Sequence, residues 1–329
     1  MSAHPITVLL TGANGFIGSH VTKKLASSSS FQVVAIVRRT DNDEAARKLK
    51  ERGAFLVEGD FYDKGVLDRV FAQFPISRVI HLAAICGEGK GKKEDYLKIN
   101  ARGTEALLEA SLKKEVKRFI YCSSVGVFGT IPAQVPGTLR TPLNGDTFYH
   151  QSKILAEEKV RDFMRRGLDA YIVRPTITYG EGDHGFSFKL VNLIRKRMPL
   201  LPHCRNVIHI LDVEKLADIF AKLITTEQAF DQRIFIAADR EPIRLRELAD
   251  FICSHYFGKN YQPAFEMPKR LYNGMSYLAK LFGSRKWETS FQLIGSSWYY
   301  DVAETSACLA LPMADTKIRF KAFLETIPP

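Results

Sequence analysis

The chain has 329 residues, of which 46% are hydrophobic and 25% charged, as in globular proteins with a large buried core. It has no run of about 18 apolar residues, and its start, MSAHPITVLL, lacks a signal-peptide layout, so we expect no transmembrane segment and a cytoplasmic location. The net charge of +11 favours anionic ligands, but no nucleic-acid-binding motif accompanies the dispersed basic residues, so we expect no nucleic acid partner. The five cysteines have neither disulfide nor metal-ligand spacing, which predicts buried thiols and no metal site.

The first predicted strand, at residues 8–10, ends in a glycine-rich turn that opens a helix. This order directs backbone N–H groups and the positive end of a helix dipole toward a dinucleotide pyrophosphate. Gly12 allows the tight turn, Gly15 lets the backbone approach the phosphate, and Gly18 lets the helix pack closely on the sheet. The turn therefore predicts a dinucleotide-binding fold.

The second predicted strand, at residues 32–37, ends where such folds choose between NAD and NADP. A carboxylate there would bind the ribose 2′-OH of NAD, whereas arginine suits the 2′-phosphate of NADP. The sequence has Val37, Arg38 and Arg39, and no carboxylate before Asp41. We therefore predict NADP, held by Arg38 and Arg39, with NAD as the alternative.

Strand and helix patterns continue to alternate, with strands at 54–57, 78–82 and 118–122 and helices at 64–74 and 96–112. The alternation predicts an α/β fold with a Rossmann-type, doubly wound parallel sheet and right-handed crossovers. Asp60 follows a strand and is placed to accept a hydrogen bond from adenine, while Ala83 and Ala84 leave room for the cofactor. Residues 86–95 lack the P-loop pattern and are expected to form a mobile loop near the substrate.

Tyr149 and Lys153 lie four residues apart in a segment with helical periodicity, which places them on one helix face. An ammonium beside a phenol favours the phenolate, so we expect Lys153 to lower the pKa of Tyr149 toward neutral pH. Such a tyrosine can act as general acid or base at a hydroxyl or carbonyl. Ser124, at the end of the strand at 118–122, could hold the same substrate oxygen.

Together these motifs resemble the extended short-chain dehydrogenase/reductases of the NAD(P)-dependent epimerase/dehydratase superfamily. The matching segments, in chain order, are TGANGFIG at 11–18, GDFYD at 59–63, HLAA at 81–84, INARGTEALLEAS at 99–111, YCSSVGVFG at 121–129, YHQSK at 149–153, RPTITYGEGD at 174–183 and IHILDVEKLAD at 208–218. Phe128 departs from the tyrosine usual in this family, which removes a hydroxyl but leaves the triad intact.

The resemblance implies that Ser124, Tyr149 and Lys153 are the catalytic triad, with Ser124 chosen over Ser123 by counting back from residues 127–129. It also implies a homodimer. With the residues argued above, the full set expected to contact the cofactor is Gly12, Asn14, Gly15, Phe16, Ile17, Gly18, Arg38, Arg39, Asp60, Phe61, Leu82, Ala83, Ala84, Asn100, Tyr149, Lys153 and Pro175.

We expect residues 1–180 to form the dinucleotide-binding domain, with 207–240 returning to it, and 181–206 and 241–329 to form a smaller, interleaved substrate lobe. Arg205 resembles the arginine that holds the pyrophosphate of nucleotide sugars in the superfamily, and Asn192 is a second candidate ligand beside Ser124. Apolar residues at helical spacing within 267–286, flanked by Lys and Arg, suit a cover over an apolar substrate, contact with a membrane surface, or core packing.

The sequence thus predicts an epimerase/dehydratase-type oxidoreductase that transfers hydride at a hydroxyl or ketone carbon of a nucleotide sugar. Arg38 and the apolar tail favour a different enzyme, an NADPH-dependent reductase or dehydrogenase of an apolar, flavonol-like or hydroxysteroid-like compound. A third hypothesis is a non-catalytic NADP(H)-sensing protein. The presence of all three triad residues argues against it.

Overall fold

A computed structural model describes residues 5–38, 44–196, 201, 205–262 and 267–328. Its centre is a seven-stranded sheet in the order β10-β6-β5-β4-β1-β2-β3, in which all neighbouring strands are parallel. The strands are β1 (Ile6–Thr11), β2 (Phe31–Val37), β3 (Phe55–Glu58), β4 (Arg78–His81), β5 (Arg118–Cys122), β6 (Ala170–Pro175) and β10 (Ile234–Ala237). The predicted doubly wound parallel sheet is confirmed.

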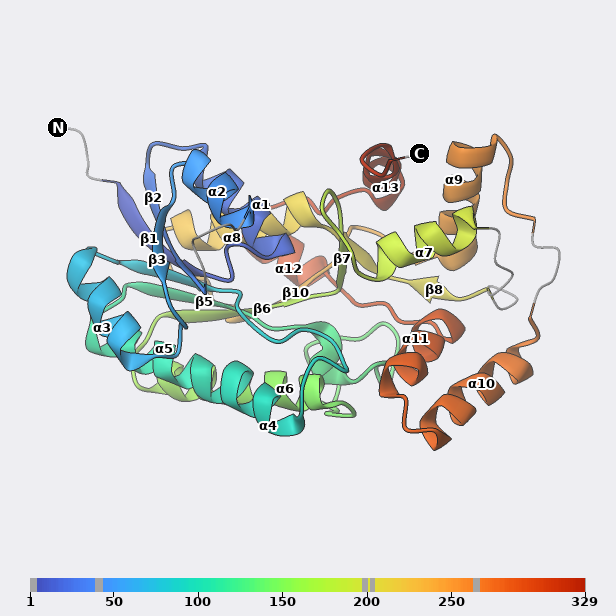
Figure 1. Cartoon of the computed structure of the whole chain (residues 1–329), viewed down its shortest axis with the longest axis horizontal. Helices are drawn as coiled ribbons and strands as arrows, with labels where there is room; N and C mark the ends of the chain where they lie inside the picture. The colour runs from blue at the N-terminus through green and yellow to red at the C-terminus, as the bar shows by residue number, and fades with distance from the viewer. Residues whose placement is uncertain (1–4, 39–43, 197–200, 202–204, 263–266, 329) are drawn as a thin grey trace.

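Helices cover both faces of the sheet (Figure 1). One face carries α1 (Phe16–Ala26), α2 (Glu44–Glu51), α8 (Val213–Thr225) and α12 (Ala303–Leu309). The other carries α3 (Lys64–Gln73), α4 (Lys93–Tyr96), a π-helical segment η1 (Leu97–Arg102), α5 (Gly103–Lys113) and α6 (Phe148–Arg165). Because both faces are covered, the strands are apolar runs: every residue of β5 and β6 is buried.

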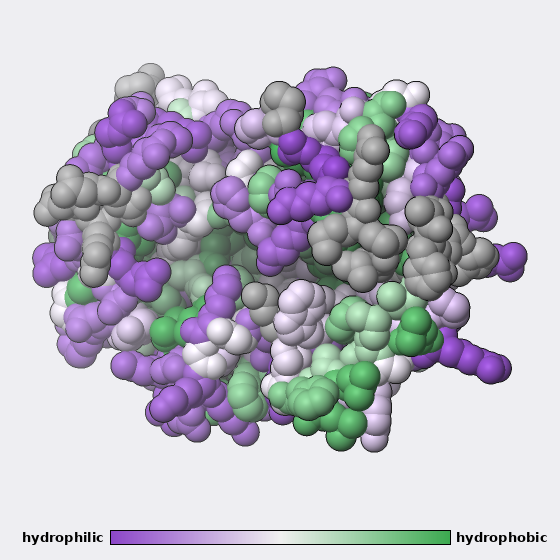
Figure 2. Space-filling view, turned by 45° about the vertical axis from the view of Figure 1, so that its right-hand side comes forward, coloured by the Kyte–Doolittle hydropathy of each residue, from purple (hydrophilic) through white to green (hydrophobic). Residues whose placement is uncertain are grey.

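The rest of the chain lies beyond the carboxyl ends of the strands (Figure 1). It contains a short 3₁₀ turn η2 (Val125–Phe128), α7 (Phe186–Arg195), α9 (Leu245–Phe257), α10 (Lys269–Leu281), α11 (Arg285–Gly295) and α13 (Thr316–Glu325). Its small sheets pair β7 (Ile177–Tyr179) with β9 (Ile210–Asp212), and β8 (Val207–Ile208) with β11 (Ile243–Arg244). Hydrophobic residues gather on the surface over α10 and α11 (Figure 2).

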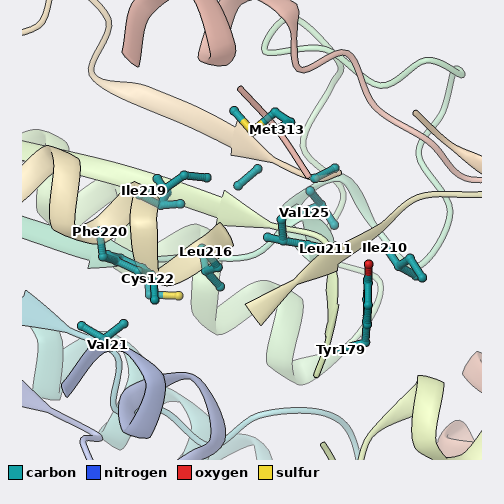
Figure 3. Packing of buried hydrophobic residues seen from close by; sticks show 14 of the residues in the cluster. Val21, Cys122, Val125, Tyr179, Ile210, Leu211, Leu216, Ile219, Phe220 and Met313 are labelled. Carbon is teal, nitrogen blue, oxygen red and sulfur yellow. The ribbon is translucent and has the colours of Figure 1, made fainter. Parts of the chain in front are cut away.

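The apolar core is divided by the sheet into two clusters. The larger one contains Val21 of α1, Phe220 of α8 and Cys122 of β5, and continues to Met313 before α13 (Figure 3). The smaller one lies under α3, α5 and α6. Burying a side chain such as Phe220 stabilises the fold by about 1.5–3 kcal/mol, so these clusters fix the helices that carry the site.

The apolar run at 207–211 predicts a single strand, and this prediction is wrong, because β8 ends at Ile208 and β9 begins at Ile210. Between them, His209 turns inward, where its ring bonds the Asp239 carbonyl at 2.7 Å and the Tyr300 amide at 3.3 Å. Consequently β8 and β9 belong to different sheets.

Candidate active site

The glycine turn has the close packing expected from the sequence. Gly12 has a φ of +73°, and a Cβ there would lie 2.8 Å from the Ala83 nitrogen. A Cβ on Gly18 would lie 2.1 Å from the Gly12 carbonyl oxygen, so only glycine lets the first turn of α1 rest on the loop. By helix geometry the first N–H groups of α1 lack partners within the helix, which suits them to bind a phosphate. These features fit the pyrophosphate of a dinucleotide.

The other expected cofactor residues follow the carboxyl ends of neighbouring strands, the edge at which such folds bind ligands. Arg38 is exposed directly after β2, Asp60 is half-buried after β3, and Pro175 ends β6. Half-buried residues follow β4, namely Leu82, Ala83 and Ala84, and the glycine turn adds Asn14, Gly15, Phe16 and Ile17. Arg39 lies outside the described residues.

Two of the expected cofactor residues are buried and contact other residues of the protein. Phe61 is buried, and its ring lies 4.9 Å from that of His81. Asn100 is also buried: its amide oxygen accepts from the Ile85 amide at 2.8 Å, and its amide nitrogen donates to Ser152 Oγ at 2.9 Å. Asn100 therefore ties the loop after β4 to α6.

Tyr149 and Lys153 lie in the first turns of α6, whose start is capped by Thr147, which accepts from the His150 amide at 3.1 Å. Ser124 follows β5 and accepts from the Gly126 amide at 3.0 Å. Burial raises the pKa of Tyr149 well above its usual value, and a hydrogen bond with Ser124 opposes this shift. Ser124 and the Tyr149 phenol therefore lie together at the end of β5.

The expectation that Lys153 lowers the pKa of Tyr149 is wrong in this structure. The Lys153 ammonium donates to the Cys122 carbonyl oxygen at 2.6 Å and lies 4.4 Å from the centre of the Tyr121 ring. Burial lowers the pKa of Lys153, and the Tyr149 pKa is raised because burial of the phenol dominates. Sharing a helix face did not bring the ammonium to the phenol oxygen, because a backbone carbonyl holds it.

Ser124 and its neighbour Ser123 have different partners in the structure. The sequence analysis had chosen between them only by their position in the motif. Ser123 is buried and donates to Glu157 Oε1 at 2.7 Å. Glu157 is also buried and forms an ion pair with Arg174, with contacts of 2.8 and 2.6 Å. Ser123 therefore belongs to a structural network behind α6, and Ser124 is the serine next to Tyr149.

The sequence analysis missed two residues of the loop after β4. Glu88 accepts from the Tyr149 amide at 3.0 Å, so the 86–95 loop lies beside the start of α6. Cys86 lies near enough to Tyr149 to help raise the pKa of its phenol. The expectation that Cys86 is buried is wrong, because it is exposed. Among the cysteines that the structure describes, Cys122 and Cys253 are buried, Cys308 is half-buried, and Cys204 lies outside the described residues.

His81 is a further buried group at this edge. Its ring nitrogens lie 2.6 Å from Thr11 Oγ1 and 2.9 Å from Thr104 Oγ1, and burial lowers its pKa to about 3. A histidine with that pKa is neutral at pH 7 and serves here to join β1 and β4 to α5.

The expected substrate residues lie further along the chain. Asn192 is half-buried on α7, and Arg205 is exposed just before β8. No hydrogen bond within the described ranges joins either of them to Ser124, Tyr149 or Lys153. In the same ranges no three His, Cys, Asp or Glu side chains are grouped as metal ligands would be.

Comparison with known proteins agrees with this geometry. The NAD dependent epimerase/dehydratase family matches residues 8–237. UDP-glucose 4-epimerase of Erwinia amylovora is 33% identical over 166 residues, and that of Homo sapiens is 34% identical over 167. The first match covers 49% of this chain and 49% of the relative, and the second 47% and 48%, so the chain matches about half the length of these relatives.

Solved structures share the fold over almost the entire chain. UDP-glucuronic acid 4-epimerase from Bacillus cereus in complex with NAD superimposes with a TM-score of 0.76 at 18% identity, covering 98% of both chains. The terminal R domain of the myxalamid PKS-NRPS biosynthetic pathway gives 0.79 at 20% identity, covering 99% of this chain and 91% of that one. The fold and the glycine turn define a Rossmann-type dinucleotide-binding protein. The family match places it more closely: the chain belongs to the NAD dependent epimerase/dehydratase family.

Proposed function

We propose that this chain transfers hydride between a nicotinamide cofactor and a hydroxyl or ketone carbon of a nucleotide sugar. The observation that carries the proposal is the pairing of the Ser124 hydroxyl with the Tyr149 phenol at the carboxyl end of β5. Lys153 lies one turn further along α6, and the glycine turn lies at the carboxyl end of β1 in the same sheet.

The chemistry assigns one task to each side chain. The dinucleotide would supply the hydride acceptor and donor. A phenol has an ordinary pKa of about 10 and burial raises that of Tyr149 further, so Tyr149 is protonated at neutral pH and can give a proton to a carbonyl oxygen and recover it in the reverse direction. Ser124 would hold the same oxygen by a hydrogen bond, and the resemblance to the family implies that Lys153 would hold the nicotinamide ribose.

For the cofactor we propose NADP, with NAD as the alternative. The Arg38 guanidinium is exposed directly after β2, where the 2′-phosphate would lie, and Val37 before it is buried. The alternative rests on the family's description as NAD dependent and on the neighbour solved with NAD.

For the substrate, support comes from the relatives that are UDP-glucose 4-epimerases and from the exposed Arg205, which could bind a pyrophosphate. A second candidate is an NADPH-dependent reductase of an apolar alcohol or ketone. It is favoured by the exposed apolar side chains of α10 and α11, which meet the start of α6 through Arg285.

The first experiment titrates the protein with NADPH and NADH by fluorescence, then repeats the titration with UDP- and dTDP-sugars present. Binding of NADPH that a nucleotide sugar strengthens would support the proposal, and Arg205→Ala should remove that effect. If no nucleotide sugar changes NADPH binding, the second candidate replaces the first, and ketones and aldehydes are screened.

The catalytic assignment is tested by matched serine variants and by Tyr149→Phe. We expect Tyr149→Phe and Ser124→Ala to lower turnover by about 10²-fold or more while NADPH still binds. Ser123→Ala is the control, because its hydroxyl bonds Glu157 and should affect stability rather than turnover. A near wild-type rate for Tyr149→Phe would refute the assignment.

A further inference from the structure

The helices α10 and α11 form a hairpin with an exposed apolar surface. Leu271, Leu278 and Phe282 recur on one face of α10 and its end, at spacings of seven and four residues. Tyr277 and Leu281 flank them, and Trp287 follows at the start of α11. We call this set the apolar patch; all six side chains are more than half exposed, up to 83% for Phe282. Figure 2 shows it as a hydrophobic cluster at the lower right.

The hairpin has its own packing, so the exposed side chains are not needed to hold it together. Tyr272 is buried and meets the Phe291 ring edge-on at 5.3 Å, closing α10 on α11. The helices have 13 and 11 residues, too short to cross a bilayer. Over the described ranges, no helix is both long and apolar enough to be a membrane span. A partner for the patch must therefore meet it from outside.

The charges around the patch have one dominant sign. Residues 267–288 contain three lysines and two arginines against a single glutamate. Lys269, Arg270 and Lys280 are exposed on the same helix as the patch. An amphipathic helix with Leu, Phe and Trp on one side and Lys and Arg beside them is typical of segments that lie in a membrane interface. A second copy of this chain fits less well, because a two-fold contact would bring the same cations together.

The hairpin also contacts the segment that carries the catalytic tyrosine. The Arg285 guanidinium lies 4.8 Å from the centre of the Phe148 ring and donates to the Asp146 carbonyl at 3.2 Å. Tyr149 follows directly in the chain. A surface that holds the patch would thus hold the start of α6 close to it.

We propose that the α10–α11 hairpin docks this protein on the surface of a bilayer that contains anionic lipids, with the apolar patch inserted among the headgroups. The inference does not depend on the reaction proposed above, because docking can be measured without cofactor or substrate.

The two tryptophans provide a site-specific assay. Trp287 is 61% exposed in the patch, whereas Trp298 is 2% exposed in the core and should not respond. The full chain is mixed with phosphatidylcholine vesicles, with or without a quarter of phosphatidylglycerol, and the emission and the sedimented fraction are measured. We expect a blue shift and co-sedimentation with the anionic vesicles, both weakened by salt. Trp287→Phe should remove the shift but leave most of the co-sedimentation.

A matched pair of variants locates the contact. Phe282→Ser should weaken partition into anionic vesicles by about tenfold or more, because a phenylalanine side chain would no longer leave water. Leu278→Ser is a second variant in the patch with the same expected direction. Ile318→Ser is the control, since Ile318 is 68% exposed on α13, outside the hairpin, and should leave binding unchanged.

Three results would overturn the proposal. The first is that the protein does not bind anionic vesicles. The second is that it binds them and that Phe282→Ser and Leu278→Ser leave this binding unchanged. The third is that the protein does not bind vesicles but self-associates, and that Phe282→Ser abolishes the self-association. The last result would assign the patch to a second copy of this chain.

Discussion

The ion pair between Glu157 of α6 and Arg174 of β6 should dominate the stability of the contact between these two elements. Glu157 is 1% exposed and Arg174 2%. The carboxylate accepts from Arg174 twice, at 2.8 and 2.6 Å, from Ser123 at 2.7 Å and from Arg161 at 3.0 Å. Glu157→Gln keeps the size of the side chain but removes its charge. It also replaces one acceptor oxygen by an NH₂ donor, which would face the donors of Arg174, Ser123 and Arg161.

The expected cost follows from the burial of both partners. Removing one member of a buried pair leaves the other charge unpaired and costs about 3–5 kcal/mol of unfolding free energy. Arg161 binds the same carboxylate from the rim, with its side chain 36% exposed, so Arg161→Ala should cost less than about 1 kcal/mol. Replacing both partners, as in Glu157→Leu with Arg174→Met, should recover most of the loss, because no buried charge remains.

Urea unfolding followed by tryptophan fluorescence measures the parent, Glu157→Gln, Arg161→Ala, the double variant and its two single variants, Glu157→Leu and Arg174→Met. The reasoning is refuted if Glu157→Gln costs less than about 1 kcal/mol, or if the double variant loses as much as the two single changes added together. A second readout concerns Lys153, since the Glu157 charge favours its protonated form. Glu157→Gln should therefore lower the Lys153 pKa and shift the pH profile of turnover.

Three further predictions concern the buried carboxyl, the glycine turn and the cofactor. Burial raises the pKa of Asp239 to about 7, so its contribution to stability is fully present below about pH 4 and falls by up to about 4 kcal/mol as the pH rises to 7. In urea unfolding Asp239→Asn should remove that fall, and parallel pH curves for variant and parent would contradict it. Gly18→Ala should weaken NADPH binding by about tenfold or more, because its methyl would meet the Gly12 carbonyl, whereas Gly274→Ala, in open space on α10, should not. Arg38→Ala should weaken NADPH binding by a similar factor and leave NADH binding unchanged; equal losses for both would remove Arg38 from the 2′-phosphate site.

The central sheet could be predicted because its strands depend on local patterns. The apolar runs that became β1, β2 and β5 are buried on both faces, and the glycine turn marks the end of β1. The helix that contains Tyr149 and Lys153 was predicted from its periodicity, and both residues lie in α6, which Thr147 caps.

The direction of the Lys153 side chain was not predictable from its spacing to Tyr149. Helical periodicity predicts which face of the helix a residue lies on. The Lys153 ammonium, however, bonds the Cys122 carbonyl on β5, 31 positions away in the chain. The break at His209 has the same origin, because its partners, Asp239 and Tyr300, are 30 and 91 positions away. Sequence patterns predict local structure, whereas such partners depend on the completed fold.

The π-helical segment η1 also sets the rotational phase of the helix that contains it. Tyr96, Asn100 and Thr104 all bond the strand β4 or the loop after it, through Gly87, Ile85 and His81 respectively. In a regular α-helix, four residues overshoot one turn by about 40°, so three residues at this spacing would drift apart by about 80°. The wider turn of η1 takes up more residues and keeps all three side chains aimed at one wall. Removing one residue from 97–102 would restore a regular α-helix, but it would rotate Tyr96 relative to Thr104 about the helix axis. The length of this segment is therefore fixed by the contacts that residues at both of its ends make with β4 and the loop after it.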